Sequence, residues 1–247
     1  MPARLAWAQL FAVFGLLVFG KLLMELMVEP LMEPWLGKRL IYFHVVSTGA
    51  VSLGAVAAVL LISRQSAASI GLAGATRAEV AWGLIAIFPA YMANILVSVT
   101  YMLLSGRDLL NVVGDKADAM EMLAGIELSG VLPVAVYVGI HEEILFRGFM
   151  FSRLWAGLAA DRAVAGRVAA VIIAAAAFGL LHGYQGTLGM IQTFTLGVIF
   201  CVISLFRRGI WACMVAHIGI DTFGLLMLQL VLPTFREMME AATQPAG

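Results

Sequence analysis

The sequence is poor in charged residues. They make up 12% of its 247 residues, while 62% of the chain is hydrophobic. Soluble globular chains carry about 25% charged residues, because their surface faces water on every side. So few charges exclude an ordinary soluble domain and predict an integral membrane protein surrounded by the lipid bilayer.

An excess of one charge sign and a cysteine framework are also missing. Fifteen Lys and Arg residues balance fifteen Asp and Glu residues. No basic field is present to attract nucleic acid, so none is expected as a partner. The two cysteines, Cys201 and Cys213, lie in apolar segments without CxxC spacing, and we interpret both as small core residues.

Long apolar runs, in contrast, are plentiful. A transmembrane helix needs about 20 apolar residues to cross about 30 Å of hydrocarbon, and small residues within it let neighbouring helices approach closely. We therefore predict an all-α, polytopic membrane helix bundle with about seven to eight transmembrane helices, forming a single domain over residues 1–247. The runs cover residues 5–28, 40–63, 80–104, 124–140, 167–181, 188–206 and 210–232.

A cluster of charged residues, 141–147, follows the fourth run without a loop. We expect this helix to carry its charges at one end, before a polar connection over 151–167. Each charged side chain inside a membrane costs about 2.5 to 3.5 kcal/mol. Glu143 and Arg147 stand one helical turn apart and can pair, whereas Glu142 points about 100° away around the helix. The alternative is that the cluster is only the water-exposed end of a helix.

Two further polar groups occur at helical spacing in later runs. His182 follows Phe178 by four residues at the end of an Ala-rich run, which on its own is more typical of an interfacial residue than of a ligand. His217 and Asp221 share one face of an otherwise apolar helix. Such a pair can simply fasten two helices. Because a buried ion pair stabilises little compared with packed apolar side chains, we favour a functional role.

Six polar residues on three predicted helices make up the candidate site, and we expect them to converge on one buried pocket. They are Glu142, Glu143, Arg147, His182, His217 and Asp221. A carboxylate and imidazoles in such a pocket can activate water, either as general bases or through a bound metal. Peptide hydrolysis is the natural reaction class. A zincin helix is excluded, because Leu145 occupies the place of the second histidine in His-Glu-x-x-His.

These motifs resemble those of the CAAX protease and bacteriocin-processing (CPBP, or ABI) family of intramembrane proteases, which includes the type II CAAX prenyl endopeptidases. The family patterns are Glu-Glu-x-x-x-Arg, Phe-x-x-x-His and His-x-x-x-Asn/Asp. They are matched in that order by Glu142, Glu143 and Arg147, by Phe178 and His182, and by His217 and Asp221. The resemblance covers residues 130–225, where we expect the catalytic core, while the preceding part agrees only in its apolar helices.

The resemblance implies an intramembrane endopeptidase, a hydrolase, and leaves two mechanisms open. In the metal-free mechanism, Glu142 is the general base, Arg147 holds Glu143, His182 orients the water and His217 supports the oxyanion. In the metal-dependent mechanism, Glu142, His182 and His217 bind Zn²⁺ and water fills the fourth position.

The third motif ends in Asp221, whereas some members of the family carry Asn there. An Asn amide can donate a hydrogen bond to an oxyanion, but an ionised Asp cannot. We therefore interpret Asp221 as a group that orients His217 or as a metal ligand. The oxyanion then lacks one candidate donor.

The expected substrate is a membrane-associated peptide or protein, cut by CAAX-type or related processing in a prokaryotic cell membrane. Two other functions stay open. One is a proton-coupled small transporter, whose spans also hold carboxylates and histidines. The other is a catalytically idle membrane scaffold of the same fold. The Glu142 and Glu143 doublet, together with the complete motif set, favours the protease.

Overall fold

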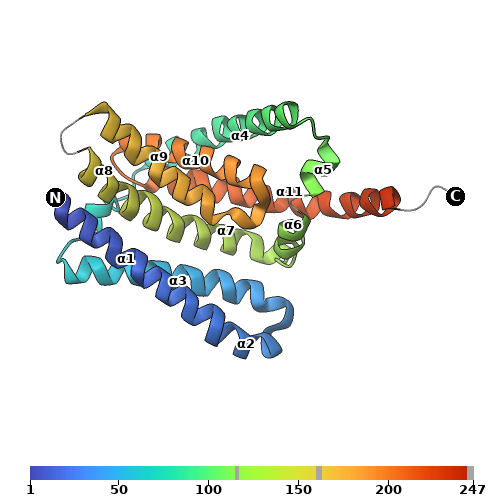
Figure 1. Cartoon of the computed structure of the whole chain (residues 1–247), viewed down its shortest axis with the longest axis horizontal. Helices are drawn as coiled ribbons and strands as arrows, with labels where there is room; N and C mark the ends of the chain where they lie inside the picture. Colours follow the sequence, from blue (N-terminus) through green and yellow to red (C-terminus); the bar gives the residue numbers. More distant parts are fainter. Residues whose placement is uncertain (115–116, 160–162, 244–247) are drawn as a thin grey trace.

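The computed structural model describes residues 1–114, 117–159 and 163–243, and every regular element in these ranges is helical. Seven helical segments within these described ranges are long and apolar enough to cross a membrane. The prediction of a polytopic helical membrane bundle is confirmed (Figure 1).

The helices follow one another with short connections. The elements are α1 (Ala3–Leu23), η1 (Met24–Val28), α2 (Glu29–Leu36), η2 (Gly37–Arg39), α3 (Leu40–Ile62), η3 (Ala67–Ile70), α4 (Arg77–Ser105), α5 (Leu109–Gly114), α6 (Ala117–Ala124), α7 (Leu128–Glu143), η4 (Ile144–Phe151), α8 (Ser152–Leu158), α9 (Val164–Leu181), η5 (Gly183–Gln185), α10 (Gly186–Arg207) and α11 (Trp211–Thr243). The π-helical turns η1 and η4 join their neighbours into continuous spans over Ala3–Leu36 and Leu128–Leu158.

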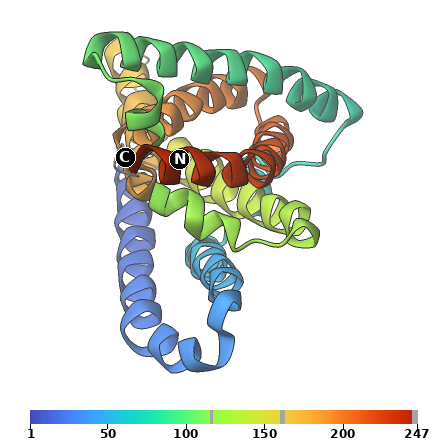
Figure 2. The same cartoon turned by 90° about the vertical axis from the view of Figure 1, so that its right-hand side faces the viewer.

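The arrangement places four helices at the centre. In Figures 1 and 2, α4 lies on one side of the group formed by α7, α9, α10 and α11, while α1 and α3 lie on the other. Much of the outer surface is apolar: Phe11 is 70% exposed, Leu61 76% and Trp35 85%. Such a surface is unsuited to water, and in a membrane protein it faces lipid.

Small residues bring the central helices together. A Cβ atom on Gly139 of α7 would lie 2.7 Å from the Ile218 side chain on α11, and one on Gly197 of α10 would lie 2.9 Å from the Ala175 backbone on α9. Ala170, Ala174 and Ala175 are buried along α9. Packing of this kind replaces the hydrophobic effect, which does not drive helices together in lipid.

Two expectations about the spans were wrong. The polar cluster 141–147 does not end a helix, because η4 and α8 carry the fourth span on to Leu158. The charges therefore lie in the middle of a 31-residue segment. Residues 29–36 lie between the first two predicted runs and were therefore expected within a connection, but they are helical, with Pro30 in the first turn of α2 and Pro34 inside it.

Candidate active site

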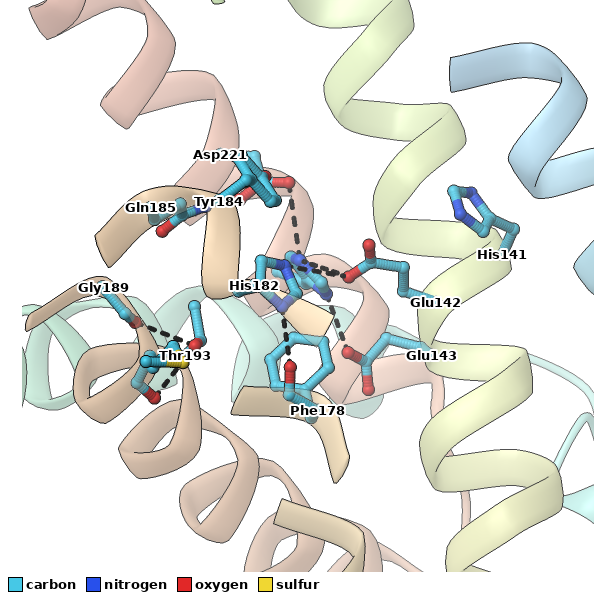
Figure 3. A network of polar contacts seen from close by, with 12 residues as sticks. His141, Glu142, Glu143, Phe178, His182, Tyr184, Gln185, Gly189, Thr193 and Asp221 are labelled. Carbon is cyan, nitrogen blue, oxygen red and sulfur yellow. Dashed lines mark hydrogen bonds and ion pairs between the residues drawn. The ribbon is translucent and has the colours of Figure 1, made fainter. Parts of the chain in front are cut away.

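The structure brings all six predicted residues together in the central helices. Glu142 and Glu143 end α7, and Arg147 lies in the π-helix that follows. His182 terminates α9, while His217 and Asp221 lie on α11. Figure 3 shows the carboxylates of α7 directed toward His182 and the side chains of α11. A π-helical turn widens the backbone, and such turns are frequent at functional sites.

Glu143 is held on two sides. Its side chain is fully buried, and its Oε1 accepts hydrogen bonds from Arg147 Nη1 at 2.8 Å and from His217 Nδ1 at 2.7 Å. The guanidinium of Arg147 packs over the rings of Phe178 and Phe200, at 4.1 Å and 4.9 Å from their centroids. Glu143 is thus fixed between a cation and an imidazole, and it has no room to meet a substrate.

Glu142 has a different environment, although it is the next residue. Its side chain is 18% exposed, and its Oε2 lies 3.9 Å from His182 Nε2 and 3.7 Å from His217 Nε2. No hydrogen bond within the described part of the chain uses this oxygen. These separations are too long for direct hydrogen bonds, so among the described residues this buried oxygen faces two imidazoles without a hydrogen-bond partner.

Hydrogen bonds at Nδ1 orient both imidazoles. His182 Nδ1 donates to the Phe178 carbonyl at 2.7 Å, and His217 Nδ1 donates to Glu143. In each ring Nε2 is left facing Glu142. His182 lies between the spans of α9 and α10, and burial lowers the pKa of its imidazole. This shift favours the neutral ring, whose Nε2 can accept a hydrogen bond from water.

Asp221 completes the polar cluster on α11. Its Oδ2 lies 3.4 Å from His217 Nε2, and its side chain is 29% exposed. Because Glu143 holds one nitrogen of this ring and Asp221 approaches the other, the plane of His217 is restrained from two sides. This position fits an orienting role.

Sequence reasoning overlooked Tyr184, which lies beside the site in Figure 3. It belongs to η5, its ring centroid is 5.9 Å from that of His182, and half of its surface is exposed. Gln185 Nε2 donates to the Tyr184 hydroxyl oxygen at 3.0 Å. The phenolic hydrogen is left available. An aromatic residue two positions after a motif histidine was the signal that sequence analysis did not use.

His141 adjoins the glutamates in sequence but not in space. It points to the opposite side of α7 in Figure 3. Its Nδ1 donates to the Tyr137 carbonyl at 2.9 Å, and its ring packs against that of Tyr137. Its contacts are those of a buried structural residue, in agreement with its omission from the predicted site.

The zinc hypothesis can be compared with this geometry. Two imidazole nitrogens and one carboxylate are the donor set of many catalytic zinc sites. Within the described ranges, however, no group of three His, Cys, Asp or Glu side chains is arranged to hold a metal ion. The site has the donor types for zinc without the assembled geometry, so no catalytic step is assigned to a metal.

Comparison with known proteins agrees with the motifs. Residues 125–223 match the family model described as type II CAAX prenyl endopeptidase Rce1-like. The matched region contains all six candidate residues. Neither the comparison with curated proteins nor that with solved structures gives a match.

Proposed function

We propose that this chain, whose residues 125–223 match the Rce1-like type II CAAX prenyl endopeptidase model, is an intramembrane endopeptidase that cuts a membrane-associated peptide or protein. One observation carries the proposal. Of two adjacent glutamates, Glu143 has no exposed side-chain surface and its Oε1 is bonded on two sides, whereas Glu142 is partly exposed and presents its unpaired Oε2 to two imidazoles. A general base needs such a free, oriented oxygen.

The first step is activation of water between Glu142 and His182. Glu142 Oε2 and His182 Nε2 each accept one hydrogen of the same water, so its lone pair is directed to the substrate carbonyl. As the water oxygen bonds to the carbonyl carbon, Glu142 takes a proton, and the carbonyl π electrons move to the oxygen. Protonated Glu142 then carries the proton that the leaving nitrogen needs in the third step.

The second step stabilises the negative oxygen. In its protonated form, His217 donates one hydrogen bond from Nδ1 to Glu143. Its Nε2–H donates a second hydrogen bond to the oxyanion. Tyr184 supplies a second donor, because Gln185 already donates to its oxygen and leaves the phenolic hydrogen free. Tyr184 would thus supply the oxyanion donor that Asn provides in some relatives and that an ionised Asp221 cannot provide.

The third step is the collapse of the tetrahedral intermediate. Protonated Glu142 gives its proton to the leaving nitrogen, the C–N bond breaks and the carbonyl reforms. The products are an amine and a carboxylic acid, which loses its proton to solvent and leaves as a carboxylate, and Glu142 returns to its ionised state. Asp221 and Glu143 keep His217 in place throughout and exchange no proton with the substrate.

The transporter and scaffold alternatives lack a comparable observation. A proton path needs titratable groups in sequence across the membrane, whereas the three carboxylates of the candidate site gather around one ring, His217. A scaffold would need neither the free oxygen of Glu142 nor the orientation of His182. The geometry therefore favours hydrolysis.

The proposal is tested with full-length protein purified in detergent and a library of membrane-proximal peptides, prenylated and unprenylated. Wild type is expected to cleave at least one peptide, and Glu142→Gln is expected to cleave none of them detectably. Equal lack of cleavage by both, with proton movement by wild type in liposomes, would replace the protease by the transporter. Equal cleavage by both would remove Glu142 from the mechanism.

A further inference from the structure

A cavity of about 280 Å³ has Arg147 in its lining and contains none of the other five candidate-site residues. It is bounded by η3, by the π-helix with α8, and by the connection between α10 and α11. The lining residues that matter here are Ser69, Arg147, Ser152, Trp155, Ser204 and Arg208. None of the described lining residues is acidic.

Two arginines give this cavity its charge. Arg147 is buried, and its Nη1 is used by Glu143, but its Nη2 has no hydrogen-bond partner in the described structure. Arg208 is exposed at the rim and has a φ of +55°, which is uncommon for a residue other than glycine. The second nitrogen of a buried guanidinium normally finds an acceptor.

A third arginine lies directly behind the wall. Arg153 is almost fully buried, and its Nη1 donates to Ser152 Oγ at 2.8 Å and to the Ser69 carbonyl at 3.4 Å. Its other acceptors are the side-chain oxygens of Gln9 and Gln65, each at 2.7 Å. All of these acceptors are uncharged, so in the described structure Arg153 brings positive charge without a carboxylate.

The balance of charge around the cavity is therefore positive. Glu143 is paired with Arg147, while Arg153 and Arg208 have no ion-pair partner among the described residues. Buried charges are normally compensated by an opposite charge. Serine hydroxyls and guanidinium groups are the donors that proteins use for phosphate.

The position of the cavity suggests where such an anion comes from. Arg208, Gly209 and Ile210 of its lining lie in the connection between the spans that end at Arg207 and begin at Trp211. Trp155 lines it, and Trp is typical of the membrane interface. Apolar side chains, among them Leu205, share the lining. A free phosphate ion would leave these apolar walls without a contact, whereas a phospholipid would cover them.

We infer that this cavity binds the phosphate of an anionic phospholipid headgroup, with Arg208 at its exposed rim and Arg147 in its buried lining. The inference does not depend on peptidase activity, because its test measures binding alone. It adds a lipid ligand to a chain whose proposed substrate is a peptide.

The test compares two arginine variants of the full-length protein. Arg208→Gln removes the entrance charge. Arg64→Gln is its matched control, because Arg64 is also exposed, also has a positive φ, at +52°, and precedes η3 without lining the cavity. Each protein in detergent is titrated with short-chain phosphatidylglycerol, with phosphatidylcholine and with inorganic phosphate, and bound molecules are counted by native mass spectrometry.

Wild type and Arg64→Gln are expected to bind one phosphatidylglycerol at least tenfold more tightly than phosphatidylcholine, and Arg208→Gln is expected to lose this preference. Equal affinity in all three proteins would overturn the inference, as would an equal loss in both variants. Binding of inorganic phosphate as tight as that of phosphatidylglycerol would overturn the lipid assignment.

A second measurement uses wild type alone, so it holds even when Arg208→Gln does not fold. Photoactivatable phosphatidylglycerol, with its reactive group near the headgroup, is cross-linked to the protein and the modified peptides are mapped. Labelling is expected in residues 147–155 and 204–210. Labelling spread evenly over the membrane-facing helices would contradict the inference.

Discussion

The two sides of Arg147 differ in how their charges are balanced. On the active-site side, Glu142, Glu143 and Asp221 surround the ring of His217, and Arg147 pairs with Glu143. On the cavity side, arginines meet serine hydroxyls and no described carboxylate. In the first arrangement, two described carboxylate oxygens lack a hydrogen-bond partner: Glu142 Oε2, which faces two imidazoles, and Glu143 Oε2, which belongs to a fully buried side chain. The second is left open for an anion from outside.

A charged residue in a membrane helix is therefore not by itself a catalytic group. Arg147 and Glu143 compensate each other and shape the site, while Glu142, which lacks such a partner, is free to react. Arg153 shows a third situation, a buried cation bonded only to neutral oxygens. Each prediction below disturbs one of these balances.

Removal of the charge on Glu143 is expected to have the largest effect, which is a loss of stability. Glu143→Gln leaves the buried guanidinium of Arg147 without a counter-charge, and we expect a loss of about 3 to 5 kcal/mol in the free energy of unfolding. Glu25→Gln is the matched control, since its partner Lys21 is also four residues away but both side chains are exposed. We expect a change of less than about 1 kcal/mol there. Unfolding in mixed micelles measures both, and equal losses would refute the distinction.

Separation of α7 from α11 should also disable the active site. A Cβ atom in Gly139→Ala meets Ile218 and pushes Glu142 away from His217. A misplacement of about 1 Å can cost about 10²-fold in rate, and we expect a loss of this size in kcat. Gly54→Ala serves as the control, because nothing lies within 4 Å of a Cβ atom there. Full activity of Gly139→Ala would show that this close approach does not position the site.

Loss of the Tyr184 hydroxyl tests the proposed hydrogen bond from Tyr184 to the oxyanion. Buried oxyanion donors contribute about 10² to 10³ in kcat, and because Tyr184 is half exposed we expect Tyr184→Phe to lower kcat only about tenfold. KM should stay the same, since the ring is retained. An unchanged kcat, or an effect confined to KM, would assign Tyr184 to substrate contact instead.

Removal of metal should have the smallest effect. The side chains around Glu142 are not assembled as a metal site, so dialysis against a chelator is expected to leave cleavage unchanged. Metal analysis of the same sample provides the control for complete removal. Loss of activity that zinc restores would establish the metal-dependent mechanism, with Glu142, His182 and His217 as the ligands.

The sequence predicted the parts of the site that depend on local spacing. Glu143 pairs with Arg147 and His217 lies near Asp221, because residues four apart share a helical face. The hydrogen bond from His217 to Glu143 spans 74 residues. It depends on the close approach at Gly139, which no local pattern reveals.

The membrane spans were also predicted from the sequence, apart from the continuation of the fourth. Seven apolar runs gave the spans, since length and hydropathy suffice for that. The continuation of the fourth span to Leu158 was missed, because the polar residues 141–147 look like a helix end until their partners on α9 and α11 are known. Tyr184 was missed because its role depends on the turn after His182. The family assignment is confirmed by the match over residues 125–223, while the roles of the individual residues stay predictions.

The most direct test of the central claim is a single-turnover cleavage in water labelled with ¹⁸O, using the first substrate found. If Glu142 activates water, the new carboxylate of the product carries ¹⁸O, and the peptide that contains Glu142 carries none. Label in Glu142, with an unlabelled product, would show that the glutamate attacks the carbonyl itself and would contradict the account.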